Sequence, residues 1–213
     1  MYIYAEDKIF LKKSQAYAVD YMLELEKKLR KRGLNTQMIL IGNGARNMIT
    51  QNDYDVVEFD FNLNVLHAEN LEDGKAIHDL VDRIMNNMNK LRELQETKEF
   101  NSALKINRIF LGPREKGKFA IEVSIIRCDE DGNWLRLERE NNTDTYSWKQ
   151  LHNSKNYIEV ASKIKNSINW EIVRNEYLDI KNDHYYNREK ISSLECYIEA
   201  LNNVYSNIKE DDK

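Results

Sequence analysis

Apolar and polar residues alternate through the segment from Val57 to Leu66. Its odd-numbered positions are apolar, and its even-numbered positions begin with Glu58 and Asp60. Because successive side chains of a strand point to opposite faces of a sheet, the pattern predicts a strand with one buried and one polar face. The segment from Lys118 to Arg127 has the same pattern, with Glu122 among its polar positions. We therefore expect two strands that each present acidic residues on a polar face.

Other segments show helical periodicity or short apolar runs. Apolar stripes with a period near 3.6 residues predict amphipathic helices. Short apolar runs next to glycine or proline predict further strands. The expected helices cover residues 12–32, 73–94, 157–166, 170–181 and 192–207, and the expected additional strands cover 38–41, 104–111 and 134–137.

The order of these elements predicts an α+β fold of α/β-like character. Strands and helices alternate over the first part of the chain, and only helices are expected after residue 150. We therefore expect a domain over residues 1–150, with a mixed sheet flanked by helices, and a C-terminal helical region over residues 151–213.

Composition narrows the classes of function. The net charge of −4 gives no overall attraction to nucleic acid or to an anionic membrane. Cys128 and Cys196 match no metal or disulfide framework, which indicates free thiols in a reducing compartment. The apolar runs are too short to span a bilayer. We expect a soluble cytoplasmic protein with no membrane partner.

The two acidic positions of the first alternating segment are candidates for metal binding. Residues two apart on a strand point the same way, with Cα atoms roughly 6.5–7 Å apart. Carboxylate oxygens are the ligands that Mg²⁺ or Mn²⁺ prefers. Glu122, on the polar face of a later strand, would add a third carboxylate to Glu58 and Asp60. Such a cluster suits phosphoryl or nucleotidyl transfer, whereas the plainer interpretation is a solvated strand face.

The segment Gly42-Asn43-Gly44 contains two of the seven glycines of the chain. It follows the expected strand 38–41 and precedes a short helix expected from Ala45 to about Ile49. Backbone N–H groups of such a loop can approach phosphate oxygens, and Arg46 could add a charged contact. The alternative is an ordinary Asn-Gly turn.

Taken in order, Gly42-Asn43-Gly44, Glu58-Phe59-Asp60-Phe61 and Glu122 resemble the signature of the nucleotidyltransferase superfamily, the polymerase-beta-like fold. The segment from Gly42 to Val65 also resembles small nucleotidyltransferase-like proteins of Firmicutes genomes and mobile elements. The resemblance implies that Glu58, Asp60 and Glu122 bind metal and act in catalysis, and that Gly42, Asn43, Gly44 and Arg46 bind the nucleotide.

The resemblance further implies a Mg²⁺-dependent enzyme that moves an NMP group from a nucleoside triphosphate, such as ATP, to an acceptor hydroxyl. The acceptor could be a small molecule, a protein or an RNA. Asn43 stands where Ser or Gly is expected, and Glu58 and Glu122 stand where Asp is common. These departures favour an alternative, a catalytically degenerate binding module with a partner protein in a toxin–antitoxin or phage-defence system. A third hypothesis is an unrelated α+β interaction protein.

Overall fold

The computed structural model describes residues 1–52, 56–69, 73–100, 102–112, 117–140, 143–151, 160–165, 170–189 and 193–211. The chain forms two compact units that interleave along the sequence. One unit consists of Glu6–Asn47 and Val56–Leu151, and the other of Met1–Ala5, Met48–Asp55 and His152–Lys213. These units group two early segments with the C-terminal part of the chain. The division expected at residue 150 stays a prediction.

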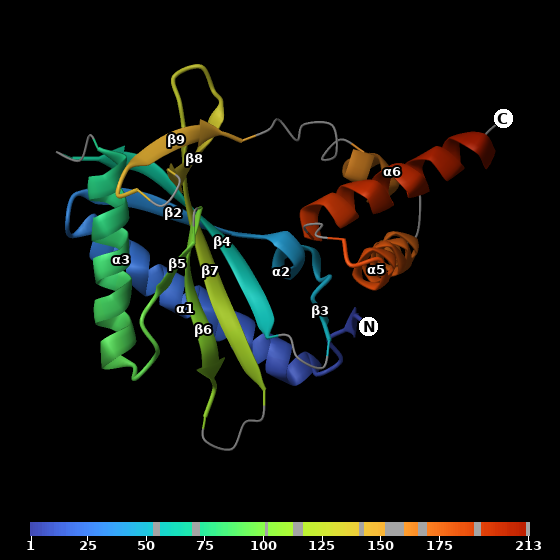
Figure 1. Cartoon of the computed structure of the whole chain (residues 1–213), viewed down its shortest axis with the longest axis horizontal. Coiled ribbons are helices and arrows are strands. Elements are labelled where there is room, and N and C mark those ends of the chain that lie inside the picture. Colours follow the sequence, from blue (N-terminus) through green and yellow to red (C-terminus); the bar gives the residue numbers. More distant parts are fainter. Residues whose placement is uncertain are drawn as a thin grey trace. The chain divides into compact units, whose positions relative to one another are not determined.

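The larger unit contains a seven-stranded mixed sheet (Figure 1). Along the chain its strands are β2 (Leu34–Ile41), β4 (Val57–Ala68), β5 (Lys98–Phe100), β6 (Ala103–Phe110), β7 (Lys118–Cys128), β8 (Trp134–Arg139) and β9 (Tyr146–Gln150). Five of them lie side by side in the order β2-β4-β7-β6-β5, and β8 pairs with both β7 and β9. The pair of β4 and β7 is parallel, and the other pairs are antiparallel.

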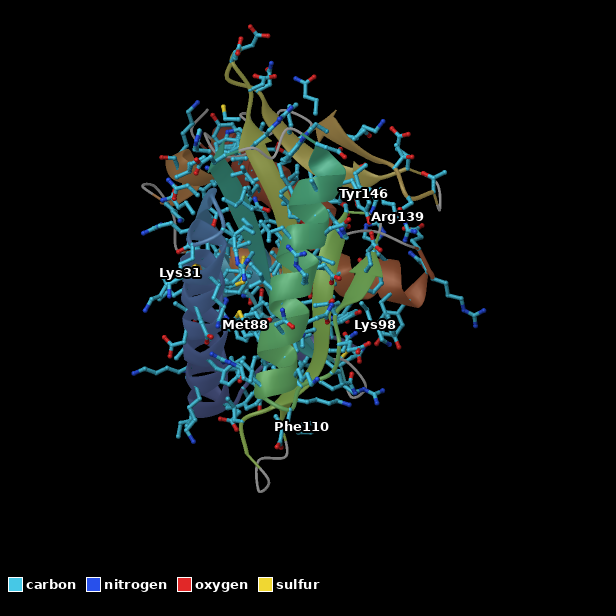
Figure 2. The ribbon with its side chains drawn as sticks, turned by 90° about the vertical axis from the view of Figure 1, so that its left-hand side faces the viewer. Lys31, Met88, Lys98, Phe110, Arg139 and Tyr146 are labelled. Carbon is cyan, nitrogen blue, oxygen red and sulfur yellow. The ribbon has the colours of Figure 1, made fainter. Side chains whose placement is uncertain are left out.

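Two amphipathic helices, α1 (Lys8–Arg30) and α3 (Gly74–Leu91), pack with this sheet and contact each other. Figure 2 shows them running beside one another in front of the strands. In both helices the buried apolar residues recur every three or four positions, as expected of amphipathic helices. Leu23 of α1 and Leu91 of α3, although apolar, are exposed, so the buried stripes differ in part from the expected ones. Asp7 caps the start of α1 by accepting a hydrogen bond from the backbone N–H of Phe10 at 2.8 Å. Gly33, with φ +83°, turns the chain just after this helix.

Aromatic rings join α1 to the apolar face of the central strands. Phe119 on β7 makes edge-to-face contacts with Phe10 and Tyr17 of α1, at centroid distances of 6.4 and 5.6 Å. Phe59 on β4 lies 6.0 Å from the same ring and is fully buried. Because side chains alternate along each strand, burying these rings turns the even-numbered residues of β4 and β7 to the opposite face.

The smaller unit has its own helices and a short two-stranded sheet. Its described elements are β1 (Ile3–Tyr4), β3 (Thr50–Gln51), a helical segment at 160–165, α5 (Trp170–Tyr186) and α6 (Ser193–Asp211). Asn182 of α5 exchanges two hydrogen bonds with the backbone of Tyr2, at 2.6 and 3.0 Å. The hydroxyl of Tyr4 donates to the carbonyl of Arg174 at 2.6 Å. These contacts attach the N-terminal strand to α5.

The structure confirms the expected α+β fold and the mixed sheet, and it differs from the expectation in local detail. The short helix α2 spans Gly42–Arg46 instead of starting at Ala45. It begins earlier because Gly42, with φ +63°, turns the chain at the end of β2, and it ends at Asn47, which adopts a left-handed conformation. β1, β3, β5 and β9 were not expected. Within the described ranges, the helices are too short or too polar to cross a membrane.

Candidate metal centre

The register of the central strands brings the candidate carboxylates together. In the parallel pair of β4 and β7, Asp60 lies directly opposite Glu122. Glu58 precedes Asp60 by two positions on β4 and therefore shares its face. The cross-strand pair of Asp60 with Glu122 therefore places the third carboxylate beside the other two.

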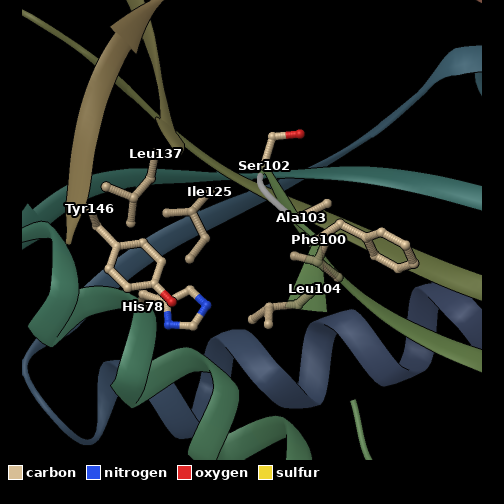
Figure 3. A pocket seen from close by; sticks show the side chains of 9 residues that line it. His78, Phe100, Ser102, Ala103, Leu104, Ile125, Leu137 and Tyr146 are labelled. Atoms are coloured by element: carbon tan, nitrogen blue, oxygen red, sulfur yellow. The ribbon is translucent and has the colours of Figure 1, made fainter. Parts of the chain in front are cut away.

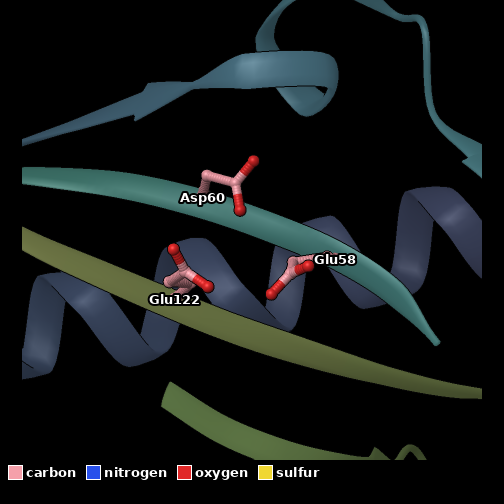
Figure 4. Close-up of side chains that lie close together, drawn as sticks. All are labelled: Glu58, Asp60 and Glu122. Atoms are coloured by element: carbon pink, nitrogen blue, oxygen red, sulfur yellow. The ribbon is translucent and has the colours of Figure 1, made fainter. Parts of the chain in front are cut away.

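Oxygen atoms of Glu58, Asp60 and Glu122 lie within 4.8 Å of one another. Figure 4 shows the three side chains on β4 and β7, with α1 behind the strands. All three are partly buried, and the side chains of Glu58 and Glu122 keep 36% and 34% of their surface exposed. The cluster is therefore open enough for a ligand to enter and enclosed enough to strengthen electrostatic interactions.

A lysine from a third strand completes the cluster. Lys105 on β6 is the Cα partner of Glu122, so one row across the sheet contains Asp60, Glu122 and Lys105. The Lys105 ammonium forms an ion pair with Glu58 Oε1, and its Nζ lies 3.6 Å from Glu122 Oε2. Its side chain is only 19% exposed. The centre thus consists of three carboxylates and one cation.

Burial and crowding of negative charge raise the pKa of one carboxyl group. Burial, followed by the neighbouring charges of Glu58 and Asp60, raises the pKa of Glu122 to about 7, while the charge of Lys105 opposes this increase. Burial lowers the pKa of Lys105, but its hydrogen bond and charge pairing with Glu58 outweigh this and raise it overall. Lys105 therefore remains protonated while Glu122 can hold a proton near neutral pH.

Gly42 lies directly against the cluster. A Cβ atom at this position would lie 2.5 Å from Asp60 Oδ2, far closer than atoms can pack. Ile41, which precedes it, is the Cα partner of Asp60 in the pair of β2 and β4. The backbone at the start of α2 is therefore adjacent to a candidate metal ligand. Asn43, Gly44 and Arg46 follow within α2 and are partly buried.

The donor set fits a hard divalent cation. Mg²⁺ and Mn²⁺ prefer carboxylate oxygens, and three partly buried carboxylates that share so small a space repel one another without a cation. After burial, the charges of Glu58 and Asp60 are the next causes of the raised pKa of Glu122. Glu58, Asp60 and Glu122 are therefore the residues that would hold such an ion, whereas their role in catalysis stays a prediction.

A second polar cluster, around Glu99 on β5, lies elsewhere in the larger unit. Glu99 accepts hydrogen bonds from the Tyr146 hydroxyl and, at 3.0 Å, from Arg139. His78 stacks on Tyr146 with a centroid distance of 4.3 Å, and its Nε2 lies 3.4 Å from Glu99. The adjacent cavity (Figure 3) has a volume of about 10 Å³. This space holds at most about one water, so it is too small to be a substrate pocket. The contacts of Glu99, His78 and Tyr146 join β5 to α3 and β9.

Lys181 of α5 is the centre of a polar cluster in the smaller unit. Its ammonium donates to Thr50 Oγ1 at 2.8 Å, Ser193 Oγ at 3.3 Å and the Tyr177 hydroxyl at 3.4 Å. It also lies 4.3 Å from the centre of the Tyr2 ring. These contacts link β3, α5, α6 and Tyr2, the residue before β1, through one side chain.

Sequence reasoning missed Lys105, although one signal was available. Lys105 stands between two apolar residues, Leu104 and Ile106, and such alternation indicates the polar face of a strand. The sequence does not reveal which strand is the neighbour of β6 or the register between them. A bulge further along β6, where Arg108 has φ +54°, also interrupts the alternation.

Comparison with known sequences and structures gives a match in structure alone. No protein-family model and no curated protein match the sequence. Structures of Vibrio cholerae DncV do match. DncV cyclic AMP-GMP synthase in complex with the linear intermediate pppA(3′,5′)pG has a TM-score of 0.54 at 12% identity. This match covers 80% of the present chain and 48% of the DncV chain. The form of DncV bound to 3′-deoxy GTP has a TM-score of 0.54 at 12% identity, and the match covers 97% of the present chain and 60% of the DncV chain.

The GTP-bound form of DncV gives a TM-score of 0.53 at 12% identity over 93% of this chain and 53% of that protein. The chain thus spans about half the length of the DncV chains that it matches. At this identity the likeness concerns the fold. The chain has the fold of the polymerase-beta-like nucleotidyltransferases, as the order of the glycine segment and the acidic strands predicted.

Proposed function

We propose that the chain is a metal-dependent nucleotidyltransferase that moves an NMP group from a nucleoside triphosphate to an acceptor hydroxyl. The observation that carries this proposal is the cross-strand pairing of Asp60 with Glu122, which gathers three carboxylates on one face of the sheet. The shared fold with DncV, whose structures hold GTP and a linear dinucleotide, supports the same substrate class.

In this proposal, the hydroxyl oxygen attacks the α-phosphorus, the bond to the leaving group breaks, and pyrophosphate and a proton are released. A bound divalent ion would neutralise phosphate charge and lower the pKa of the attacking hydroxyl. Glu58, Asp60 and Glu122 would hold that ion. The backbone of Gly42, Asn43 and Gly44, together with Arg46, orients the phosphates beside Asp60, which is the position that the contact between Gly42 and Asp60 favours.

Turnover of nucleotides by the purified chain tests the proposal. The chain is incubated with ATP, GTP, CTP or UTP, singly and in pairs, with Mg²⁺ or Mn²⁺, and pyrophosphate and labelled nucleotide products are measured. We expect metal-dependent pyrophosphate release, and a loss of at least about 100-fold in Asp60→Asn because the ion loses a ligand. Asp131→Asn, a change in the exposed turn after β7, is the matched control and should retain the rate.

Pairs of nucleotides are included because the ribose hydroxyl of a second nucleotide is one acceptor that the DncV complex with pppA(3′,5′)pG suggests. Release of pyrophosphate without metal, or an equal rate in Asp60→Asn, would contradict the proposal.

A second candidate is a nucleotide-binding module without turnover, acting with a partner protein. The ion pair of Lys105 with Glu58 favours it, because a cation of the chain already occupies part of the cluster. Stabilisation by a nucleoside triphosphate with no detectable pyrophosphate release would select this alternative.

A further inference from the structure

Lys105 introduces a positive charge into the carboxylate cluster. Its ammonium pairs with Glu58 and lies 3.6 Å from Glu122 Oε2. Exposed ion pairs contribute little to protein stability, because solvent and salt screen their charges. Here the lysine side chain is only 19% exposed and faces two carboxylates, so its charge acts on the cluster with little screening.

The position of this ammonium is set by the sheet. Lys105 is the Cα partner of Glu122, and its neighbours Leu104 and Ile106 are buried on the opposite face. The ring of Phe100 on β5 lies 5.9 Å from Lys105 Nζ. Because turning the side chain to the other face would expose both apolar neighbours, Lys105 stays on the face that carries Glu58 and Glu122.

The net charge of the cluster matches that of one divalent ion in magnitude. With all three carboxylates ionised, the single ammonium leaves two negative charges, which one divalent ion would neutralise. The ammonium also uses Glu58 Oε1, an atom that a metal ion would otherwise bind.

We propose that Lys105 is the resident counter-cation of the centre and competes with the divalent ion for Glu58. This inference rests on the metal centre of the proposed function and extends it to the residue that sets metal affinity. In the metal-free chain, Lys105 compensates the crowded carboxylates. When metal is added, the ammonium opposes binding through its own charge and through its contact with Glu58.

Titration of Mn²⁺ without nucleotide tests the inference. Calorimetry on the whole chain is compared for wild type, Lys105→Met and Lys105→Arg. Lys98→Met is the matched control, because Lys98 is the Cα partner of Lys105 on β5 and is exposed. We expect Lys105→Met to bind Mn²⁺ at least about tenfold more tightly than wild type, since one positive charge near the ion is removed. Lys105→Arg and Lys98→Met should stay within about twofold of wild type.

Thermal unfolding separates this role from a purely structural one. Metal-free Lys105→Met should melt at a lower temperature than wild type, and saturating Mn²⁺ should raise its melting temperature more than that of wild type. A structural role alone would lower the melting temperature without tightening Mn²⁺ binding, and that result would overturn the inference. Mn²⁺ affinity that is equal or weaker in Lys105→Met, or no Mn²⁺ binding by either protein, would overturn it as well.

The result of the Mn²⁺ titration does not depend on whether the chain transfers nucleotides. Tighter Mn²⁺ binding by Lys105→Met together with no nucleotidyl transfer would support the inference and contradict the enzymatic proposal. Transfer by wild type with unchanged Mn²⁺ affinity in the variant would do the reverse.

Discussion

Gly42 and Asp60 are in such close contact that only glycine fits: a Cβ at position 42 would lie 2.5 Å from Asp60 Oδ2. The backbone of Gly42 also has φ +63°, which L side chains rarely adopt. The glycine segment and the acidic strand are therefore in direct contact, and a side chain at position 42 must displace the carboxylate of Asp60.

The first prediction concerns Gly42→Ala. We expect a loss of about 1–2 kcal/mol in the free energy of unfolding from backbone strain and steric clash. Mn²⁺ affinity should also fall, because Asp60 must move. Gly132→Ala is the matched control, since Gly132 has φ +81° and no atom near its missing Cβ. It should lose stability without losing Mn²⁺ affinity, measured by denaturation and calorimetry. Equal Mn²⁺ affinity in all three proteins would separate Gly42 from the site.

The second prediction is a pH dependence that originates at Glu122. Its pKa rises from the ordinary value of 4.5 to about 7 in the folded chain, so the folded state binds this proton more tightly than the unfolded state. The resulting contribution to stability is fully present below about pH 4.5 and is lost as the pH rises through about 7. Metal-free Glu122→Gln should lack this decline. The measurement is the difference in melting temperature between wild type and variant from pH 4.5 to 8.

As the pH rises, the melting temperature of Glu122→Gln should increase relative to that of wild type, because the variant keeps a neutral side chain in the cluster. A difference that is constant across this range would show that Glu122 is not perturbed.

The third prediction concerns the smaller unit. Lys181 donates hydrogen bonds to Thr50 and Ser193, so Lys181→Met should lower the free energy of unfolding by about 1–2 kcal/mol. A double-mutant cycle with Thr50→Val isolates the pair and should give a coupling energy of about 0.5–1 kcal/mol. Strictly additive effects would show that Lys181 does not link β3 to α5.

Much of the fold could be predicted from the sequence, since local patterns determine it. The alternation around Phe59 and Phe61 identified β4 and its polar face, and the apolar stripes identified α1 and α3. The pairing of Asp60 with Glu122 was harder to predict. β4 and β7 are parallel neighbours separated in sequence by α3, β5 and β6, and no local pattern reveals which strands become adjacent.

Other features depend on tertiary packing. Lys105 joins the cluster only because β6 pairs with β7 in one register. The early segments Met1–Ala5 and Met48–Asp55 belong to the same compact unit as the C-terminal helices, which composition cannot show.

Calorimetric titration of Mn²⁺ against wild type and Asp60→Asn, with Asp131→Asn as control, tests the central claim most directly. The cluster of Glu58, Asp60 and Glu122 predicts that Asp60→Asn binds Mn²⁺ at least about tenfold more weakly, a change of about 1.4 kcal/mol. The same change should leave the metal-free protein equally or more stable, because it removes one of three crowded negative charges. Asp131→Asn should match wild type in both measurements. Equal Mn²⁺ affinity in wild type and Asp60→Asn would contradict the claim that these carboxylates form a metal centre.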